Sequence, residues 1–227
     1  SLTNQILDMS KMERNELKIS FIQENLCSLV RTALGLFEQM AHDQRIKMNI
    51  DIPEHPVNIM CAKDSVLTII SNLLSNAVKY GKETINIIVK CDDGETAVVR
   101  VESDGEVIPE NEREKIFQIF YQRDGAAKEG QGTGLGLPYA RNLANMHNGK
   151  LYLDGNVTEM NSFVLELPVN QKDEVKLAPS EPSISNAEKK VNDYDTSRHT
   201  LLVVEDSEEM REYLAGELTE EYNVLTA

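Results

Sequence analysis

The sequence has no tryptophan, only three cysteines and no long apolar run among its 227 residues. Cys27, Cys61 and Cys91 lie far apart and form no pattern with histidine, which argues against zinc and favours reduced thiols in a cytosolic setting. The apolar runs are too short for a membrane-spanning helix. The opening SLTNQILDMSKME also lacks the basic and apolar regions of a signal peptide.

Basic residues are scarce as well. The chain carries 23 lysines and arginines against 38 acids, a formal net charge of −15. Residues 170–227 hold 14 of the acids and only 6 of the bases, so the last quarter contributes over half of the imbalance. Neither part offers the basic surface that phosphate neutralisation on DNA requires, and we expect no contact with nucleic acid.

The apolar periodicity alternates between helix and strand patterns over residues 17–169. We expect an α+β fold, a two-layer sandwich with helices on one face of a mixed, mostly antiparallel sheet. The pattern predicts helices over 23–43, 62–80, 109–120 and 135–146, and strands over 17–22, 45–52, 57–61, 84–91, 96–102, 150–154 and 161–168.

The flanking segments differ in character from this central part. Residues 1–16 have helical spacing and are interpreted as the end of a longer helix. Residues 170–199 are rich in Lys, Glu, Ser, Asn and Pro without periodicity, which predicts a flexible linker. Residues 200–227 then resume with an apolar strand, two acids and a helix, and are interpreted as the beginning of a second domain.

A glycine-rich run, GQGTGLGL (130–137), leads into one of the predicted helices. It fits neither the GxGxxG dinucleotide fingerprint nor the GxxxxGK[ST] P-loop. Glycines let backbone N–H groups approach an anion closely, Thr133 adds a hydroxyl, and the helix start adds the positive end of a dipole. The run therefore predicts a phosphate cradle, with an ordinary loop entering a helix as the alternative.

The predicted helix 62–80 contains SNLLSNAVKY. Asn72 and Asn76 share one face, with Lys79 and Tyr80 one turn further on. Asparagine is a poor helix-interior residue, so two of them suggest a role other than helix formation. Amide oxygens suit Mg²⁺ bound to phosphates, Lys79 can neutralise phosphate charge, and Tyr80 can pack beside a nucleoside. The alternative is a merely solvated face.

Taken together, these stretches resemble the ATP-binding domain of sensor histidine kinases, within the superfamily of gyrase, heat-shock chaperone and mismatch-repair ATPases. NLLSNAVKY resembles the family's N box, FQIFYQ (117–122) its F box, and GTGLGL its second glycine box. The resemblance covers about residues 1–168 and implies ATP and Mg²⁺ as ligands, with Mg²⁺ held by Asn76 through ATP. It also assigns nucleotide binding to the second glycine box, namely Gly132, Thr133, Gly134, Leu135, Gly136 and Leu137.

The flanks extend this resemblance to a hybrid two-component sensor. Residues 1–16 resemble the end of a dimerisation helix, and residues 199–227 the start of a receiver domain, in which Glu205 and Asp206 match the acidic Mg²⁺ pair. The resemblance implies a homodimer, a phosphoacceptor His upstream of Ser1, and relay to a receiver Asp beyond Ala227. It implies a cytoplasmic location for this part and a bacterial inner-membrane anchor elsewhere in the intact protein.

None of the four histidines in the sequence sits in a phosphoacceptor box. His42, His55, His147 and His199 are therefore expected to be structural or exposed, and no catalytic residue is expected in this stretch of chain.

The first glycine box departs from the family pattern DxGxG. Aligned on Ile108-Pro109, Ser103 takes the place of the aspartate that in the family accepts a hydrogen bond from the adenine amino group, and Val107 takes the place of the second glycine. Asp104 lies one position late and Gly105 is retained. A hydroxyl accepts a weaker hydrogen bond than a carboxylate does, so adenine affinity or selectivity is in question unless Asp104 shifts into the site.

The F box also departs from the pattern. Gln122 replaces an arginine that in the family often helps to bind phosphate, with Arg123 and Lys128 nearby as substitutes.

Two other functions are considered. An ATPase of the gyrase or chaperone kind needs a glutamate four residues before the metal-binding asparagine, and that place is Asn72, which cannot act as a general base. A degenerate module that binds partners without nucleotide is favoured by Ser103 and Val107, and opposed by Asn76, Lys79 and the glycine run.

Overall fold

The computed structural model describes residues 11–12, 19–122, 133–157, 159–171, 199–203, 208–219 and 222–226. They fall into two compact units, one within residues 18–177 and one that includes residues 178–227, and each is described by itself. The predicted helix over 1–16, apart from residues 11 and 12, and nearly all of the predicted linker lie outside the described residues.

A mixed five-stranded sheet forms one layer of the described part of the first unit, in the order β2-β4-β5-β7-β6. The β2–β4 pair is parallel and the other three pairs are antiparallel, which confirms the predicted sheet type. The strands are β2 (Lys47–Asp51), β4 (Thr84–Lys90), β5 (Thr96–Ser103), β6 (Lys150–Leu153) and β7 (Asn161–Pro168).

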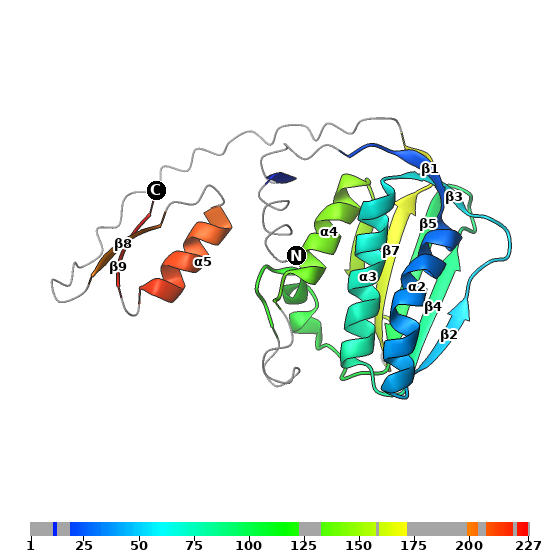
Figure 1. The fold of residues 1–227 in the computed structure, drawn as a ribbon, viewed down its shortest axis with the longest axis horizontal. Helices are drawn as coiled ribbons and strands as arrows, with labels where there is room; N and C mark the ends of the chain where they lie inside the picture. Colours follow the sequence, from blue (N-terminus) through cyan, green and yellow to red (C-terminus); the bar gives the residue numbers. More distant parts are fainter. Residues whose placement is uncertain are drawn as a thin grey trace. The chain divides into compact units, whose positions relative to one another are not determined.

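Three helices form the second layer and cover one face of this sheet (Figure 1). They are α2 (Leu26–Asp43), α3 (Lys63–Tyr80) and α4 (Gly136–Met146). Apolar side chains from α3 and the central strands, such as Leu73, Leu74, Ile87 and Val101, are almost completely buried between the layers. The predicted α+β sandwich is therefore confirmed, with α3 in the middle of the helical layer.

A short antiparallel pair of strands, β1 (Ile22–Asn25) and β3 (Asn58–Cys61), lies beside the main sheet. β1 begins five residues later than the predicted strand over 17–22. Asn25 ends it and caps α2, because its side-chain oxygen accepts a hydrogen bond from the N–H of Cys27 at 3.0 Å.

His147, at the end of α4, ties that helix to the start of α3. Its Nε2 accepts a hydrogen bond from the N–H of Ala62 at 3.1 Å, and its Nδ1 donates to the carbonyl of Leu143 at 2.7 Å. The side chain is fully buried, with the Phe21 ring 5.1 Å away. Burial lowers the pKa of His147 because the neutral ring is favoured there. A structural role is thus supported for this histidine.

The segment predicted as a helix over 109–120 is instead two separate 3₁₀ turns, Glu110–Glu112 and Lys115–Phe117. Ile116 and Phe117 are adjacent in sequence and both are buried. The second turn ends at Gln118, whose backbone is extended with ψ of 147°, so the chain leaves helical geometry before residue 120.

The second unit contains two parallel strands, β8 (Thr200–Val203) and β9 (Asn223–Thr226), with α5 (Glu208–Leu218) between them in sequence. Within the described residues, no helix is both long and apolar enough to cross a membrane.

Candidate nucleotide-binding site

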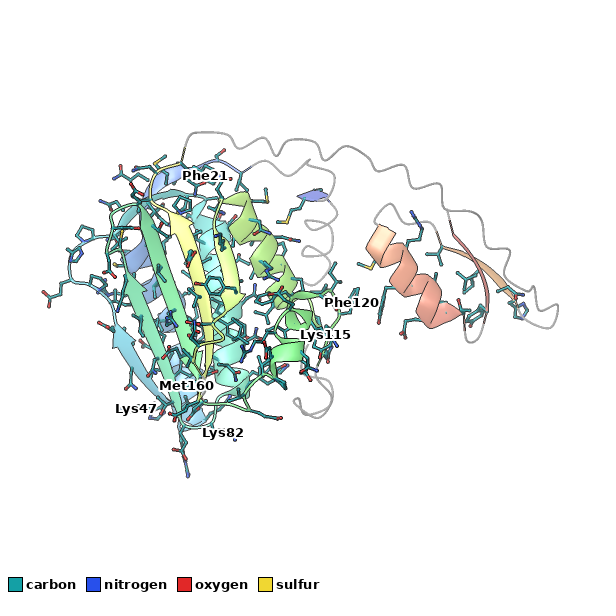
Figure 2. All side chains as sticks on the ribbon, turned by 180° about the vertical axis from the view of Figure 1, so that it is seen from behind. Phe21, Lys47, Lys82, Lys115, Phe120 and Met160 are labelled. Carbon is teal, nitrogen blue, oxygen red and sulfur yellow. The ribbon has the colours of Figure 1, made fainter. Side chains whose placement is uncertain are left out.

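A cavity of about 450 Å³ opens in the first unit beside α3. Figure 2 shows Lys82, one of its lining residues, at the opposite end of this unit from Phe21. The walls come from α3, the end of β5, the first turn of α4 and β7. The lining residues are Asn72, Ser75, Asn76, Lys79, Tyr80, Lys82, Ser103, Glu106, Ile108, Ile116, Tyr121, Gln122, Thr133, Gly134, Gly136, Leu137, Pro138, Asn161 and Phe163.

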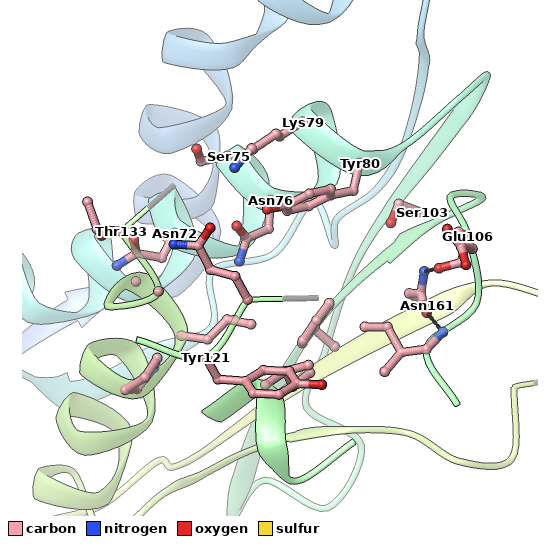
Figure 3. A pocket seen from close by; sticks show the side chains of 18 of the residues that line it. Asn72, Ser75, Asn76, Lys79, Tyr80, Ser103, Glu106, Tyr121, Thr133 and Asn161 are labelled. Atoms are coloured by element: carbon pink, nitrogen blue, oxygen red, sulfur yellow. Dashed lines mark hydrogen bonds between the residues drawn. The ribbon is translucent and has the colours of Figure 1, made fainter. Parts of the chain in front are cut away.

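One face of α3 supplies the polar wall of the cavity. Asn72, Asn76, Lys79 and Tyr80 all line it, while the other side of the helix is buried against the sheet (Figure 3). The Lys79 ammonium lies 4.7 Å from the centre of the Tyr80 ring, a cation–π contact that places a positive charge at the cavity. The sequence placed these four side chains together, and the structure brings them to one cavity.

The glycine run forms the facing wall, where Thr133, Gly134, Gly136 and Leu137 line the cavity. Gly134 has φ of +68°, and a Cβ there would lie 2.6 Å from the backbone of Phe120, so only glycine fits without strain. The carbonyl of Gly134 accepts a hydrogen bond from the N–H of Phe120 at 3.1 Å. The F-box segment therefore fixes the position of the loop.

Gly136 brings this wall close to the asparagines. A Cβ at Gly136 would lie 2.9 Å from the side-chain oxygen of Asn72. Leu135, between the two glycines, is fully buried and does not line the cavity, so its role is to anchor the loop. Gly132 lies outside the described residues.

The two residues at the end of β5 face opposite ways. Buried and half-buried positions alternate along β5, and Ser103 follows Val99 and Val101 on the buried face, where it lines the cavity with 4% of its surface exposed. Asp104 does not line the cavity. Its carboxylate accepts hydrogen bonds of 2.9 to 3.0 Å from the N–H groups of Lys82, Glu83 and Thr84. Asp104 is therefore engaged elsewhere and does not replace Ser103.

The pKa of Asp104 reflects this engagement. Desolvation is the largest single influence and raises it, but the hydrogen bonds from these three backbone N–H groups and from that of Asp104 itself together outweigh desolvation and hold the pKa below its usual value. Asp104 thus acts as an ionised cap on the connection between α3 and β4.

Gly105 does not line the cavity, but its backbone passes close to the backbone of Tyr80 at the end of α3. A Cβ at this position would collide with the carbonyl oxygen of Tyr80, so the backbone after β5 can pass the end of α3 only as glycine.

Sequence reasoning missed the wall formed by β7 and the loop before the first 3₁₀ turn. The Asn161 side chain accepts from the N–H of Ile108 and donates to the carbonyl of Glu106, both at 2.9 Å, which holds this loop in place. Phe163 and Ile116 add buried apolar surface. Asn161 is a polar residue at the start of the apolar run NSFVLELP, and this position could have indicated a role for it.

Several predicted residues cannot be placed. Glu205 and Asp206, the acidic pair, and Arg123 and Lys128, the possible phosphate-binding substitutes, lie outside the described residues.

Known proteins similar to this chain include sensor histidine kinases and related ATPases. Residues 61–171 match the family model described as histidine kinase-, DNA gyrase B-, and HSP90-like ATPase. The chain is 26% identical to the sensor histidine kinase TmoS of Ectopseudomonas mendocina, over 99% of this chain and 25% of the relative. It is 32% identical to the non-motile and phage-resistance protein of Caulobacter vibrioides, over 77% of this chain and 21% of the relative. The chain thus spans about a quarter of the length of these relatives.

Solved structures show the same fold. The nucleotide-free catalytic domain of the histidine kinase ThkA is similar with a TM-score of 0.59 and 28% identity, covering 66% of this chain and 95% of that domain. Full-length ShkA in complex with AMPPNP is similar with a TM-score of 0.63 at 20% identity, covering all of this chain and 44% of that protein. The chain is a homologue of sensor histidine kinases, and its residues 61–171 match the model of the ATPase family that includes them.

Proposed function

We propose that this chain is the ATP- and Mg²⁺-binding catalytic part of a hybrid sensor histidine kinase. In the intact protein it would present ATP to a histidine on a dimerisation domain, for later relay to a receiver aspartate. The observation that carries the proposal is the convergence of Asn72, Asn76 and Lys79 with the glycine loop at one cavity.

The residues at the cavity fit a magnesium nucleotide. The amide oxygens of Asn72 and Asn76 are hard ligands of the kind Mg²⁺ accepts, and Asn76 is proposed to hold the ion together with the phosphates. Bound Mg²⁺ would supply neutralisation of phosphate charge. A Cβ at Gly136 would fill the narrow gap between this residue and the Asn72 side chain. The absence of a Cβ supports the proposal that a phosphate can come close to the backbone there.

The chain's own contribution would be to position the nucleotide and balance its charge. Lys79 and Lys82 line the cavity and offer positive charge to the phosphate oxygens. Thr133, Gly134 and the first turn of α4 line the same cavity, where their backbone N–H groups would be available to bind an anion. Phosphoryl transfer depends chiefly on positioning and electrostatic stabilisation, so a cavity of this kind needs no general base of its own.

The hybrid organisation is part of the proposal. A strand, a helix and a second strand parallel to the first within residues 200–226 support the start of a receiver domain. Glu205 and Asp206 follow β8 in sequence, the position proposed for its acidic Mg²⁺ pair. The proposed partners are the dimerisation helices and receiver of the same protein, in a homodimer anchored in the bacterial inner membrane by other segments.

Calorimetric titration with AMPPNP, with and without Mg²⁺, tests the proposal. We expect saturable binding that strengthens with Mg²⁺, and Asn76→Ala is expected to lower the affinity with Mg²⁺ by about 30-fold because a ligand amide is lost, ~2 kcal/mol. Asn145→Ala is the matched control, since Asn145 is an exposed helical asparagine outside the cavity. Absence of binding by the unmodified chain would contradict the proposal.

The second candidate is a signalling module that binds partner proteins without nucleotide. Ser103 favours it, because the side chain at that position is a neutral hydroxyl and Asp104 is held by other groups. The same titration separates the two candidates, since only the proposed kinase function predicts Mg²⁺-dependent binding of AMPPNP.

A further inference from the structure

The two ends of the cavity differ in chemistry. Thr133, Asn72 and Asn76 lie on one side in Figure 3, and Ser103 lies on the other. Glu106 and Asn161 lie on the Ser103 side in Figure 3. Two apolar lining residues are near Asn161: Ile108, whose N–H donates to Asn161, and Phe163, two positions further along β7 and more than nine-tenths buried. If the triphosphate takes the polar end, as the proposed function requires, the flat apolar base must take the end that contains Ser103.

Ser103 is a buried hydroxyl with no hydrogen-bond partner among the described residues. Its oxygen points toward the cavity in Figure 3. The other buried polar side chain in this wall, Asn161, already donates to Glu106 and accepts from Ile108. Asp104 is held by three backbone N–H groups on the far side of the strand end. Ser103 therefore offers a hydroxyl to the edge of the base, beside the Glu106 side chain, which also lines the cavity.

We propose that this cavity does not discriminate between 6-amino and 6-oxo purine nucleotides, because the base edge meets the Ser103 hydroxyl. This inference rests on the proposed function and specifies its substrate class. A hydroxyl rotates to accept a hydrogen bond from a 6-amino group or to donate one to a 6-oxo group. An ionised carboxylate only accepts, so it favours the amino group and repels the oxo group.

Inosine triphosphate is the probe that isolates this difference, since its base differs from adenine only along the edge that carries the 6-substituent. The dissociation constants of ATP and of inosine triphosphate are measured with Mg²⁺ by calorimetry on the whole chain. We expect them to agree within about tenfold. A preference for ATP of more than tenfold would overturn the proposal while leaving the proposed function intact. If neither nucleotide binds, the proposed function fails and this inference fails with it.

Ser103→Asp tests the residue itself and is expected to raise the preference for ATP by at least about tenfold. A change smaller than threefold would overturn the assignment. Ser75→Asp is the matched control, because Ser75 also lines the cavity but on α3. The added charge should weaken both nucleotides by a similar factor and leave their ratio unchanged. If Ser103→Asp fails to fold, Ser103→Ala decides: both nucleotides should weaken by similar factors, and a change in their ratio of more than threefold would contradict the assignment.

Discussion

The two ends of the cavity are built in different ways. The end proposed for the phosphates joins polar side chains of a single helix, α3, to a loop whose glycines are required by close backbone contacts. The end proposed for the base joins apolar side chains such as Phe163 to Glu106, Asn161 and Ser103, and the Ser103 hydroxyl has no hydrogen-bond partner among the described residues. The first end depends on backbone geometry, and the second depends on the identity of one side chain. Substitutions in the glycine loop should therefore lower nucleotide affinity, and substitutions at Ser103 should change base selectivity.

Gly134→Ala should have the largest effect, on the phosphate end. A Cβ at Gly134 meets the backbone of Phe120, and φ is positive, so the loop must move. We expect nucleotide affinity to fall by about 100-fold, ~2.7 kcal/mol, measured by calorimetry. Gly94→Ala is the control, because Gly94 has a similar positive φ but open space around it. That variant should lose about 1 kcal/mol of stability and keep its affinity. Equal affinity losses in the two variants would contradict the assigned role of the loop.

Asp104→Ala should affect the stability of the fold and not base selectivity. It removes the acceptor for the N–H groups of Lys82, Glu83 and Thr84, and the free energy of unfolding should fall by about 1–2 kcal/mol in urea titrations. Because the pKa of Asp104 is lowered in the folded state, this stabilisation is present at neutral pH and is lost as pH falls through that lowered pKa. A change in the ratio of ATP to inosine triphosphate affinity in Asp104→Ala would contradict the prediction that Asp104, unlike Ser103, has no part in base selectivity.

Gly136→Ala should have a smaller effect than Gly134→Ala at the same end. The added Cβ meets the side-chain oxygen of Asn72, which can rotate away, rather than backbone atoms. We expect nucleotide affinity to fall by about threefold to tenfold, ~1 kcal/mol. An affinity loss as large as that of Gly134→Ala would mean that the position of Asn72 is as critical as the loop itself.

The smallest effect concerns His147, which joins the two helices that carry the phosphate end. Its pKa is lowered in the folded state, so the unfolded chain takes up the proton first as pH falls below 6.5. Stability should fall with decreasing pH in that window, by no more than about 1.4 kcal/mol per pH unit for one proton. His147→Gln should reduce this slope, and the exposed control His42→Gln should not. Identical slopes in all three proteins would contradict the buried neutral state.

Much of the fold follows from local patterns. The spacing of apolar residues located α2, α3 and α4 to within three residues, because each helix buries one stripe against the same sheet. The helix predicted over 109–120 was wrong, because the segment forms two separate 3₁₀ turns and becomes extended at Gln118, which the spacing of apolar residues does not reveal. The order of the strands, with β2 parallel to β4 at the sheet edge, depends on long-range pairing that periodicity does not encode.

The cavity shows the same division between local and long-range information. The spacing of Asn72, Asn76 and Lys79 on a helix was enough to place them together. The alternation along β5 could also have placed Ser103 inward and Asp104 outward, because period two continues from Val99 through Val101. The contacts of Asp104 with residues about 20 positions earlier, and of Asn161 with residues about 55 positions earlier, become visible only in the folded chain.

The most direct test of the account is an amide NMR titration of the chain with AMPPNP and Mg²⁺. The account predicts that the largest shifts occur at Asn76, Ser103 and Gly134, from both ends of the cavity, with little change at Asp93 in the hairpin turn between β4 and β5. Shifts confined to residues away from the cavity, or none at saturating nucleotide, would contradict a nucleotide site between α3 and the glycine loop.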